Sequence, residues 1–432
     1  MKLQGTMSVK GNNLFIGGVG TSDLKKKYDT PLYIFDEELV RENCREYTKY
    51  FKVDERKNRV AYAGKAFLPL YMCGVINDEG MYLDVVSLGE LYTAHKANFP
   101  MNKVLFHGNN KTLEEVNLGI DLGVSRFVVD NYYELELLDR ICGEKNKTQE
   151  IYFRITPGIE AHTHDYIKTG QIDSKFGFTL QNGDLYEAFK KIKDYKNLKL
   201  VGLHAHIGSQ IFDVKPFLDE VEIMMNLVKE ARENYNLDIK EVDLGGGVGV
   251  YYTSEDKPKS IKEFCGEIIK KADEVCEKIN IDLPILVIEP GRSIVANAGS
   301  TLYTVGSIKE IKDVRTYVSV DGGMTDNIRP SLYNAGYECA VANKMNGEKG
   351  KLITIAGKCC ESGDILIVDA DINKIESGDL LIMASTGAYG YSMSSNYNKI
   401  LRPAVVSVFG GESKLICKRQ TLDELLSLEI NY

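Results

Sequence analysis

The sequence predicts an α/β protein in which a (β/α)8 TIM-type barrel is combined with an antiparallel β-sandwich or β-barrel domain. Two observations predict this fold class. From about residue 30 to residue 292, short apolar runs alternate with longer amphipathic stretches rich in Lys and Glu, which is typical of βα units with a parallel sheet. After Arg292, short strand-like runs follow one another with Gly, Asp and Asn between them, which is typical of a β domain.

The barrel is expected to contain eight strands, each a short apolar run. They are Val60–Ala63, Tyr82–Val86, Lys103–Phe106, Arg126–Val129, Ile151–Ile155, Leu200–Leu203, Glu241–Leu244 and Ile285–Ile288. Helical periodicity marks segments between them, including Leu113–Leu122, Tyr132–Ile141, Pro216–Tyr235 and Ile261–Ile279. Eight such units over this length match the size of a (β/α)8 barrel.

The strands predicted for the second domain are shorter and lack long helices between them. They include Tyr317–Val320, Lys351–Ala356, Ile365–Val368, Asp379–Ala384 and Ala404–Phe409. A weak strand, Asn13–Ile16, could complete this domain, because chain termini often lie close together. We therefore expect residues 1–30 to join the β domain, residues 31–295 to form the barrel and residues 296–432 to form the C-terminal β domain.

Composition excludes several classes of protein. Hydrophobic residues make up 44% and charged residues 27% of the chain, as in ordinary globular enzymes. A net charge of −9 argues against a nucleic-acid partner, and the absence of a long apolar run argues against a membrane span or a signal peptide. The nine cysteines are odd in number and form no C-x-x-C motif, which favours a reducing, cytoplasmic location.

Polar or ionisable residues stand just beyond every predicted barrel strand. In strand order they are Lys65, Ser87, His107, Asp130, Arg154, His204 with His206, Gly245-Gly246-Gly247, and Glu289 with Arg292. The carboxyl ends of barrel strands meet at one mouth, where the active sites of such barrels lie. Loops are often polar for other reasons, but eight such positions in register favour a functional site.

A phosphate site is predicted after strands seven and eight. Three consecutive glycines, Gly245 to Gly247, let backbone N–H groups approach an anion, and Glu289-Pro290-Gly291-Arg292 supplies a guanidinium after the next strand. The alternative is that the glycines form only a tight turn. The order of residues differs from G-x-x-x-x-G-K-[ST], which disfavours a P-loop.

Lys65 is the candidate nucleophile. It follows the first strand in Tyr62-Ala-Gly-Lys65-Ala66, and its small, apolar neighbours suggest a partly desolvated amine of lowered pKa. An ordinary surface lysine is the alternative. Glu289 could bond a pyridine nitrogen and keep it protonated, and His206 could stack on the ring or act as an acid or base.

Metal binding is the competing interpretation, because His-x-His occurs at His162/His164 and again at His204/His206. A binuclear-metal hydrolase barrel would carry its His-x-His on the first strand and an Asp after the eighth. This chain has Lys65 and Glu289 in those places, so no catalytic metal is predicted.

A set of short motifs, taken together and in order, resembles the diaminopimelate decarboxylases of the alanine-racemase-like, fold-type III class of pyridoxal-phosphate enzymes. The resemblance runs through nearly the whole chain. Its marks are Tyr62-Ala-Gly-Lys-Ala, Asp84-Val-Val-Ser, His107-Gly-Asn-Asn-Lys, His162-Thr-His, Ser174-Lys-Phe-Gly, His204-Ala-His-Ile-Gly-Ser-Gln, Leu244-Gly-Gly-Gly, Glu289-Pro-Gly-Arg, Asp326-Asn-Ile-Arg-Pro-Ser-Leu-Tyr, Cys360-Glu-Ser-Gly-Asp and Gly387-Ala-Tyr. One departure is minor, since Phe67 stands where the family usually has Asn.

The resemblance implies that the chain decarboxylates meso-2,6-diaminopimelate to L-lysine with pyridoxal 5'-phosphate as cofactor. It implies that Lys65 holds the cofactor as a Schiff base, that His206 stacks on its ring and that Cys360 supplies a proton. It further implies a homodimer in which Cys360 and Glu361 reach the site across the interface. The cofactor-binding residues implied are Lys65, His206, Ser209, Gly246, Gly247, Glu289, Pro290, Gly291, Arg292 and Tyr389, and the substrate-binding residues are Arg292, Arg329, Tyr333, Glu361 and Tyr389.

Three alternatives remain open at this point. A sister decarboxylase would act on ornithine, lysine, arginine or carboxynorspermidine, and a racemase of the same class would use a tyrosine as its second base. A non-catalytic relative would have lost Lys65 or the phosphate site, and this chain keeps both. The sequence leaves open the roles of Cys359, His162, His164 and Lys175.

Overall fold

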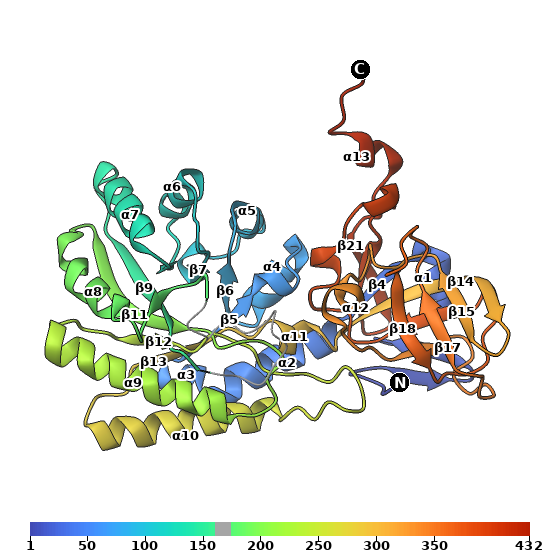
Figure 1. Ribbon diagram of the computed structural model, residues 1–432, viewed down its shortest axis with the longest axis horizontal. Helices are drawn as coiled ribbons and strands as arrows, with labels where there is room; N and C mark the ends of the chain where they lie inside the picture. Colours follow the sequence, from blue (N-terminus) through green and yellow to red (C-terminus); the bar gives the residue numbers. More distant parts are fainter. Residues whose placement is uncertain (160–173) are drawn as a thin grey trace. The chain divides into compact units, whose positions relative to one another are not determined.

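The computed structural model of the protein describes residues 1–159 and 174–432. Contacts divide the chain into two compact units (Figure 1). The barrel unit comprises Asn43–Gly249 and Pro258–Gly291, and the β unit comprises Met1–Glu42, Val250–Lys257 and Arg292–Tyr432. Whether the domains end where the sequence predicts, at residues 30 and 295, stays a prediction.

The predicted (β/α)8 barrel is confirmed. Eight parallel strands follow one another around the barrel, and the last pairs with the first to close it. In order around the barrel they are β5 (Arg59–Ala63), β6 (Tyr82–Val85), β7 (Val104–Phe106), β8 (Arg126–Val129), β9 (Gln149–Thr156), β11 (Leu198–Ala205), β12 (Glu241–Asp243) and β13 (Ile285–Ile288). A short additional strand, β10 (Phe178–Thr179), pairs with β9.

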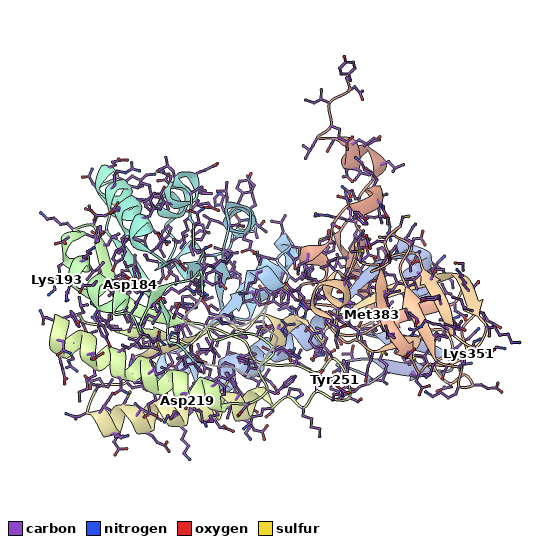
Figure 2. All side chains as sticks on the ribbon, viewed as in Figure 1. Asp184, Lys193, Asp219, Tyr251, Lys351 and Met383 are labelled. Atoms are coloured by element: carbon purple, nitrogen blue, oxygen red, sulfur yellow. The ribbon has the colours of Figure 1, made fainter. Side chains whose placement is uncertain are left out.

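Helices surround these strands, and their ends carry the capping residues that helix formation favours. Thr112 with Glu115 and Ser260 with Glu263 form capping boxes at the starts of α6 and α10. The α-helices of the barrel unit are α3 (Val53–Arg56), α4 (Leu70–Asp78), α5 (Leu88–Lys96), α6 (Leu113–Leu122), α7 (Tyr132–Glu144), α8 (Asp184–Lys191), α9 (Lys215–Tyr235) and α10 (Ile261–Ile279), and α2 (Glu37–Tyr50) begins in the β unit. Asp184 and Lys193 lie in this outer layer (Figure 2). The helical predictions are therefore confirmed, with α6 and α10 matched at both ends.

A buried network of charges lies at the amino-terminal ends of the barrel strands. Glu241, the first residue of β12, accepts hydrogen bonds from Arg59 Nη1 (2.8 Å) and Arg126 Nη2 (2.9 Å). Arg59 and Arg126 are themselves the first residues of β5 and β8, and Tyr152 of β9 also donates to Glu241. Although burial by itself raises the pKa of Glu241, the two guanidiniums hold it below its usual range.

The β unit contains a long curved sheet and a small three-stranded one. The long sheet runs β18-β17-β15-β14-β4-β20-β21, and β19 pairs with β14 and β16. The strands of the long sheet are β4 (Leu32–Asp36), β14 (Gly299–Ile311), β15 (Arg315–Val320), β16 (Cys339–Val341), β17 (Ile353–Ala356), β18 (Ile365–Ala370), β19 (Leu380–Met383), β20 (Ala404–Phe409) and β21 (Glu412–Cys417). The small sheet contains β1 (Ser8–Lys10), β2 (Asn13–Ile16) and β3 (Val19–Gly20), and the helices are α1 (Thr21–Tyr28), α11 (Arg292–Val295), α12 (Arg329–Tyr333) and α13 (Leu422–Leu426).

The core of the β unit is formed by apolar residues from both ends of the chain. Leu32 and Ile34 of β4 pack with Leu302, Ile382 and Val406, all of them buried. Met383 is also buried in this unit, whereas Lys351 lies at its surface (Figure 2). Residues Met1–Glu42 belong to this unit.

The predicted antiparallel β domain is confirmed for most strand pairs, with the difference that two of its strand pairs are parallel. β4 pairs in parallel with β20, and β15 pairs in parallel with β17. Neither pair is joined by a hairpin: the barrel separates β4 from β20 along the chain, and α12 and β16 lie between β15 and β17. Long connections permit parallel pairing, which a tight turn does not. β4 thus pairs within this sheet, although the boundary predicted at residue 31 would assign it to the barrel.

Candidate active site

A buried carboxylate lies at the carboxyl ends of the barrel strands, between two imidazole rings. Glu289 follows β13, and its Oε1 lies 2.7 Å from Nε2 of His107, the residue after β7. Its Oε2 lies 3.2 Å from Nε2 of His204, which is part of β11. The structure thus brings together three of the residues that the sequence predicts at the barrel mouth.

The carboxyl groups of this region have pKa values that move in opposite directions. Burial raises the pKa of Asp84 to about 6 and raises that of Asp243 well above its usual range. Burial also acts to raise the pKa of Glu289, but His107 and His204 hold it well below its usual range. Of these three carboxyl groups, only Glu289 has a pKa below its usual range, so it is the one whose ionised form this environment favours.

The predicted glycine-rich loop forms a tight backbone cradle beside Glu289. A Cβ on Gly246 would lie 2.2 Å from the backbone oxygen of Glu289, and a Cβ on Gly247 would lie 2.2 Å from that of Gly208. Gly247 also has a φ of +110°, which L side chains rarely adopt. Its oxygen accepts a hydrogen bond from the Ile211 N–H (3.0 Å), so the loops after β11 and β12 are held together. Only glycine fits here, as a backbone cradle for an anion requires.

The half-buried residues His206 and Ser209 lie in the loop after β11, next to this cradle. The Gly246 N–H donates to Nδ1 of His206 (3.3 Å). Burial lowers the pKa of His206 well below its usual range, and the positive charges of Lys65 and Arg154 add to this effect. His206 is therefore neutral near pH 7, as a ring that stacks on another ring should be.

Lys65 lies in a short 3-10 turn, Gly64–Ala66, directly after β5. Gly64 and Ala66 are buried, but Lys65 itself is exposed. The prediction of a desolvated amine, made from the apolar neighbours in the sequence, is thus wrong, because those neighbours pack into the barrel wall and do not surround the amine. The positive charge of Lys65 acts on Asp84, Glu90 and His206, so the amine does face the barrel mouth.

The β unit contains a cluster of two buried arginines and four tyrosines, here called the arginine–tyrosine cluster. Its members are Arg292, Arg329, Tyr252, Tyr333, Tyr337 and Tyr389. Arg329 Nε donates to the Tyr337 hydroxyl (2.9 Å), and Arg292 Nη1 donates to the Tyr252 hydroxyl (2.7 Å). The guanidinium of Arg329 lies 5.3 Å from the Tyr333 ring centre, and that of Arg292 lies 4.9 Å from the Tyr389 ring centre.

Two features indicate that this cluster is built to bind something. Tyr389 has a φ of +59°, an uncommon conformation for a bulky residue and one that is concentrated at functional sites. Within residues 1–159 and 174–432, no carboxylate lies at ion-pair distance from Arg329, although that side chain is buried. A buried cation with only phenolic partners is a binding site for an anion.

Cys360 and Glu361 are exposed on a short loop of the β unit. The loop is held by Asp364, which accepts hydrogen bonds from the N–H groups of Cys359 (2.8 Å) and Met324 (2.6 Å). The Cys360 N–H donates to Oδ1 of Asn398 (2.8 Å). Burial and Asp364 raise the pKa of Cys359 to about 12, so this neighbouring thiol stays protonated at neutral pH.

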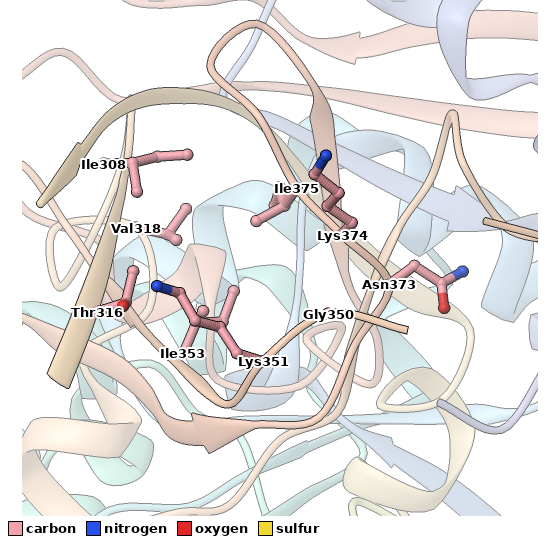
Figure 3. Close-up of a pocket in the computed structure, with 9 residues that line it drawn as sticks. All are labelled: Ile308, Thr316, Val318, Gly350, Lys351, Ile353, Asn373, Lys374 and Ile375. Atoms are coloured by element: carbon pink, nitrogen blue, oxygen red, sulfur yellow. The ribbon is translucent and has the colours of Figure 1, made fainter. Parts of the chain in front are cut away.

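Several predicted or possible sites need separate mention. His162 and His164 lie outside the described residues, and Lys175 is exposed. A cavity in the β unit is lined by Ile308, Thr316, Val318, Gly350, Lys351, Ile353, Asn373, Lys374 and Ile375 (Figure 3). It contains none of the predicted site residues. No helix within the described ranges has the length and apolarity needed to cross a membrane.

His107, His204 and Glu289 also have the donor types of a metal site, and their donor atoms lie within 4.8 Å of one another. The contacts of 2.7 and 3.2 Å that join them are, however, of hydrogen-bond length. Only the contact with His204 has hydrogen-bond geometry, whereas Nε2 of His107 lies close to Oε1 of Glu289 without being hydrogen-bonded to it.

Sequence reasoning missed Asp243, Tyr252 and Tyr337. Asp243 lies within the predicted strand Glu241–Leu244, and the sequence gave no separate indication of a role for its carboxyl group. Tyr252 and Tyr337 carry the hydroxyls that hold the two arginines, but they lie 85 residues apart (337 − 252) and only the folded β unit brings them to 5.3 Å between ring centres. No local pattern could have found that pair.

Comparison with known proteins gives consistent results. Residues 37–296 match the family described as "pyridoxal-dependent decarboxylase, pyridoxal binding domain". The chain is 48% identical to the diaminopimelate decarboxylase of Bacillus subtilis, with 97% of this chain and 96% of that protein covered. A crystal structure of diaminopimelate decarboxylase from M. jannaschii matches with a TM-score of 0.93 and 37% identity over 99% of this chain and 98% of that one. A second structure of that enzyme, in complex with L-lysine, matches with the same TM-score and 36% identity over 100% and 99% of the two chains.

Asp84 provides a test of the electrostatics of the barrel mouth. Its pKa is raised from 3.8 to about 6, so the folded state binds its proton more tightly than the unfolded state and loses stability as the pH rises between these values. Asp84→Asn removes this loss of stability, because an amide side chain does not ionise. We expect the variant to be more stable than the wild type at pH 8, by on the order of 3 kcal/mol, and to differ little at pH 4.

Denaturant unfolding at the two pH values measures the effect. Asp238→Asn is the matched control, since that side chain is 82% exposed in the same unit. An Asp84→Asn variant that is no more stable than the wild type at pH 8 would contradict the raised pKa.

Proposed function

Because this chain belongs to the diaminopimelate decarboxylase family of pyridoxal-dependent decarboxylases, we propose that it converts meso-2,6-diaminopimelate to L-lysine and CO2 with pyridoxal 5'-phosphate as cofactor. The observation that carries the proposal is the ionised Glu289 beside the glycine cradle, with Lys65 at the same barrel mouth. These are the three groups that a phosphorylated pyridine aldehyde needs: an acceptor for the ring nitrogen, a cradle for the phosphate and an amine.

The residues fit the cofactor on structural grounds. Gly246 and Gly247 leave backbone where any side chain would collide, and Gly291 is equally constrained, since its Cβ would lie 2.9 Å from the Cβ of Ala63. We propose that these glycines, Ser209, Pro290, Arg292 and Tyr389 bind the phosphate end, that His206 stacks on the ring and that Lys65 binds the cofactor covalently. When bound, pyridoxal phosphate withdraws electrons from the Cα of the amino acid.

Glu289 has the most direct task in this scheme. An ionised carboxylate held against the pyridine nitrogen keeps a proton on that nitrogen and so strengthens the electron withdrawal. The two imidazoles already keep Glu289 ionised in a buried position. His206 is neutral, so it stacks without repelling the protonated ring.

The substrate has an amino-acid group at each end, and one end must be recognised without reacting. Arg329 and Arg292 carry the positive charge for the distal carboxylate, with Tyr333 and Tyr389 beside them, because arginine binds carboxylates in a bidentate manner. Glu361 is the acceptor proposed for the distal ammonium. Ornithine has no distal carboxylate, so a buried Arg329 held only by tyrosines favours a substrate such as diaminopimelate, which has one.

The remaining step is the return of a proton to Cα, which we assign to the Cys360 thiol. Cys360 and Glu361 are exposed, and the exposed apolar residues Leu332 and Tyr397 lie on segments next to their loop. Exposed apolar residues beside a functional loop support a subunit interface. We therefore propose a cytoplasmic homodimer in which this loop completes the site of the other subunit.

The first experiment identifies the cofactor and the lysine together. The purified protein, given pyridoxal phosphate and then treated with borohydride, should carry the cofactor on Lys65 by peptide mapping, and should release CO2 and L-lysine from meso-diaminopimelate before that treatment. Lys111 is the internal control, since it is buried in an ion pair with Glu134 (2.6 Å) and should remain unlabelled. A protein that cannot take up the cofactor would refute the proposal.

Arg329 tests the choice of substrate. Arg329→Ala removes charge-assisted hydrogen bonds to the distal carboxylate, so kcat/KM for diaminopimelate should fall by roughly 100- to 1000-fold. Cofactor uptake, measured by absorbance, should be unchanged. Arg315→Ala in the same unit is the matched control, since its ion pair with Asp369 (3.6 Å) lies at the surface. Full turnover of diaminopimelate by Arg329→Ala would mean that another group holds that end.

Subunit mixing tests the shared site. Lys65→Ala and Cys360→Ala proteins should each be inactive, whereas an exchanged mixture should recover roughly a quarter of wild-type activity, because half of the dimers are mixed and each has one intact site. A mixture that stays inactive, although chromatography shows exchanged dimers, would place Lys65 and Cys360 in the same subunit's site.

A further inference from the structure

Two buried histidines of the barrel are assigned no cofactor or substrate atom in the function proposed above. His107 is 4% exposed and His204 is 1% exposed, and their rings meet edge to face with centres 4.9 Å apart. Nε2 of His204 is hydrogen-bonded to Oε2 of Glu289 at 3.2 Å. Nε2 of His107 lies 2.7 Å from Oε1 of Glu289 and 3.7 Å from Oδ1 of Asp84, without hydrogen-bond geometry. Both belong to motifs that the sequence singles out, yet neither lies in the glycine cradle.

His107, His204 and Glu289 meet across the barrel, because the strands that carry or precede them are not neighbours in the sheet. One strand, β12, separates β11, which carries His204, from β13, which precedes Glu289. Two strands, β5 and β6, separate β13 from β7, which precedes His107. The register pairs His204 with Arg154 and Asp243, so its ring position is fixed by backbone hydrogen bonds on both sides.

The pKa values of the neighbouring carboxyl groups show what the two histidines do for Glu289. Asp84 and Asp243 are buried nearby, and Lys65 and Arg154 also act on this region. Burial raises the pKa of both aspartates, and only Glu289, which the imidazoles face, has a lowered pKa. Burial lowers the pKa of His204 to about 4, so its ring is neutral at pH 7 and serves Glu289 as an N–H donor.

We propose that His107 and His204 are positioning residues that hold the Glu289 carboxylate ionised and correctly oriented for the pyridine nitrogen of the cofactor. The inference rests on the proposed function, because the pyridine ring belongs to it. A carboxylate has about four acceptor sites, so the hydrogen bond from His204 leaves Oε1 of Glu289, which has no hydrogen-bond partner, able to accept a further donor. Outer partners of this kind typically change the affinity of a site by one to two orders of magnitude.

The test uses His204→Phe, His204→Gln and the control His95→Gln, whose side chain is exposed on α5. Cofactor-free protein is titrated with pyridoxal phosphate, and the absorbance of the bound cofactor is followed between pH 6 and 9. His204→Phe, which has no donor, should bind the cofactor roughly 10- to 100-fold more weakly and shift the pH at which the spectrum changes. His204→Gln, which keeps a donor, should restore most of both properties, and His95→Gln should equal the wild type.

Rescue by Gln separates positioning from packing. Wild-type affinity and an unshifted spectrum in His204→Phe would overturn the inference, as would equal losses in the Phe and Gln variants. One tightly bound transition metal per chain, lost in His204→Phe, would overturn it in favour of a metal site.

A second measurement keeps the inference testable if the Phe variant does not fold or if the cofactor does not bind. The chain has six histidines, so ring ¹⁵N signals of the wild type can be assigned by comparison with His204→Gln and His107→Gln. We expect His204 to stay neutral, with its proton on Nε2, from pH 5 to 8. A ring that titrates near pH 6.5 would overturn the inference, whereas failure of the wild type to bind pyridoxal phosphate would refute the proposed function alone.

Discussion

The stability of the barrel depends on partners for the carboxylates that lie inside it at the two ends of its strands. Isolated ions inside a protein cost several kcal/mol each, so each must have partners. At the amino-terminal ends of the strands, Glu241 is paired with Arg59 and Arg126. At the carboxyl ends, Glu289 is paired with two imidazoles instead. The two sites differ in charge: two guanidiniums neutralise Glu241, whereas the hydrogen bond that Glu289 accepts from the neutral ring of His204 leaves its negative charge in place.

At two places the chain passes from the barrel unit to the β unit within a few residues of a predicted site residue of the barrel. Gly291 ends one segment of the barrel unit, and Arg292 begins a segment of the β unit. In the same way, Gly249 ends the glycine-rich loop and Tyr252 follows in the β unit. Arg292 and Tyr252 then bond to each other, at 2.7 Å. The two chain segments that follow the glycine-rich loop and Glu289 are thus joined by a hydrogen bond within the β unit.

The sequence predicts those features of the structure that depend on residues close together in the chain, and it does not predict those that depend on residues far apart. Strand positions depend on local apolar runs, and β8 and β13 match their predictions at both ends. The capping boxes of α6 and α10 are equally local. The parallel pairing of β4 with β20 is not local, because about 370 residues separate the two strands, and no pattern in either reveals its partner. The exposure of Lys65 shows the same limit at a single residue, since neighbours in the sequence need not be neighbours in space.

The arginine–tyrosine cluster shows how such long-range arrangement produces specificity. A phenol hydroxyl accepts a hydrogen bond from a guanidinium but does not neutralise it, so Tyr337 orients Arg329 and leaves its charge available. A carboxylate in place of Tyr337 would hold the arginine more strongly and would compete with an anionic ligand. The aromatic rings exclude water and favour the cation by their negative faces. Within residues 1–159 and 174–432, Arg329 therefore keeps a buried, oriented positive charge with no carboxylate at ion-pair distance, which suits the proposed recognition of a ligand with a second carboxylate.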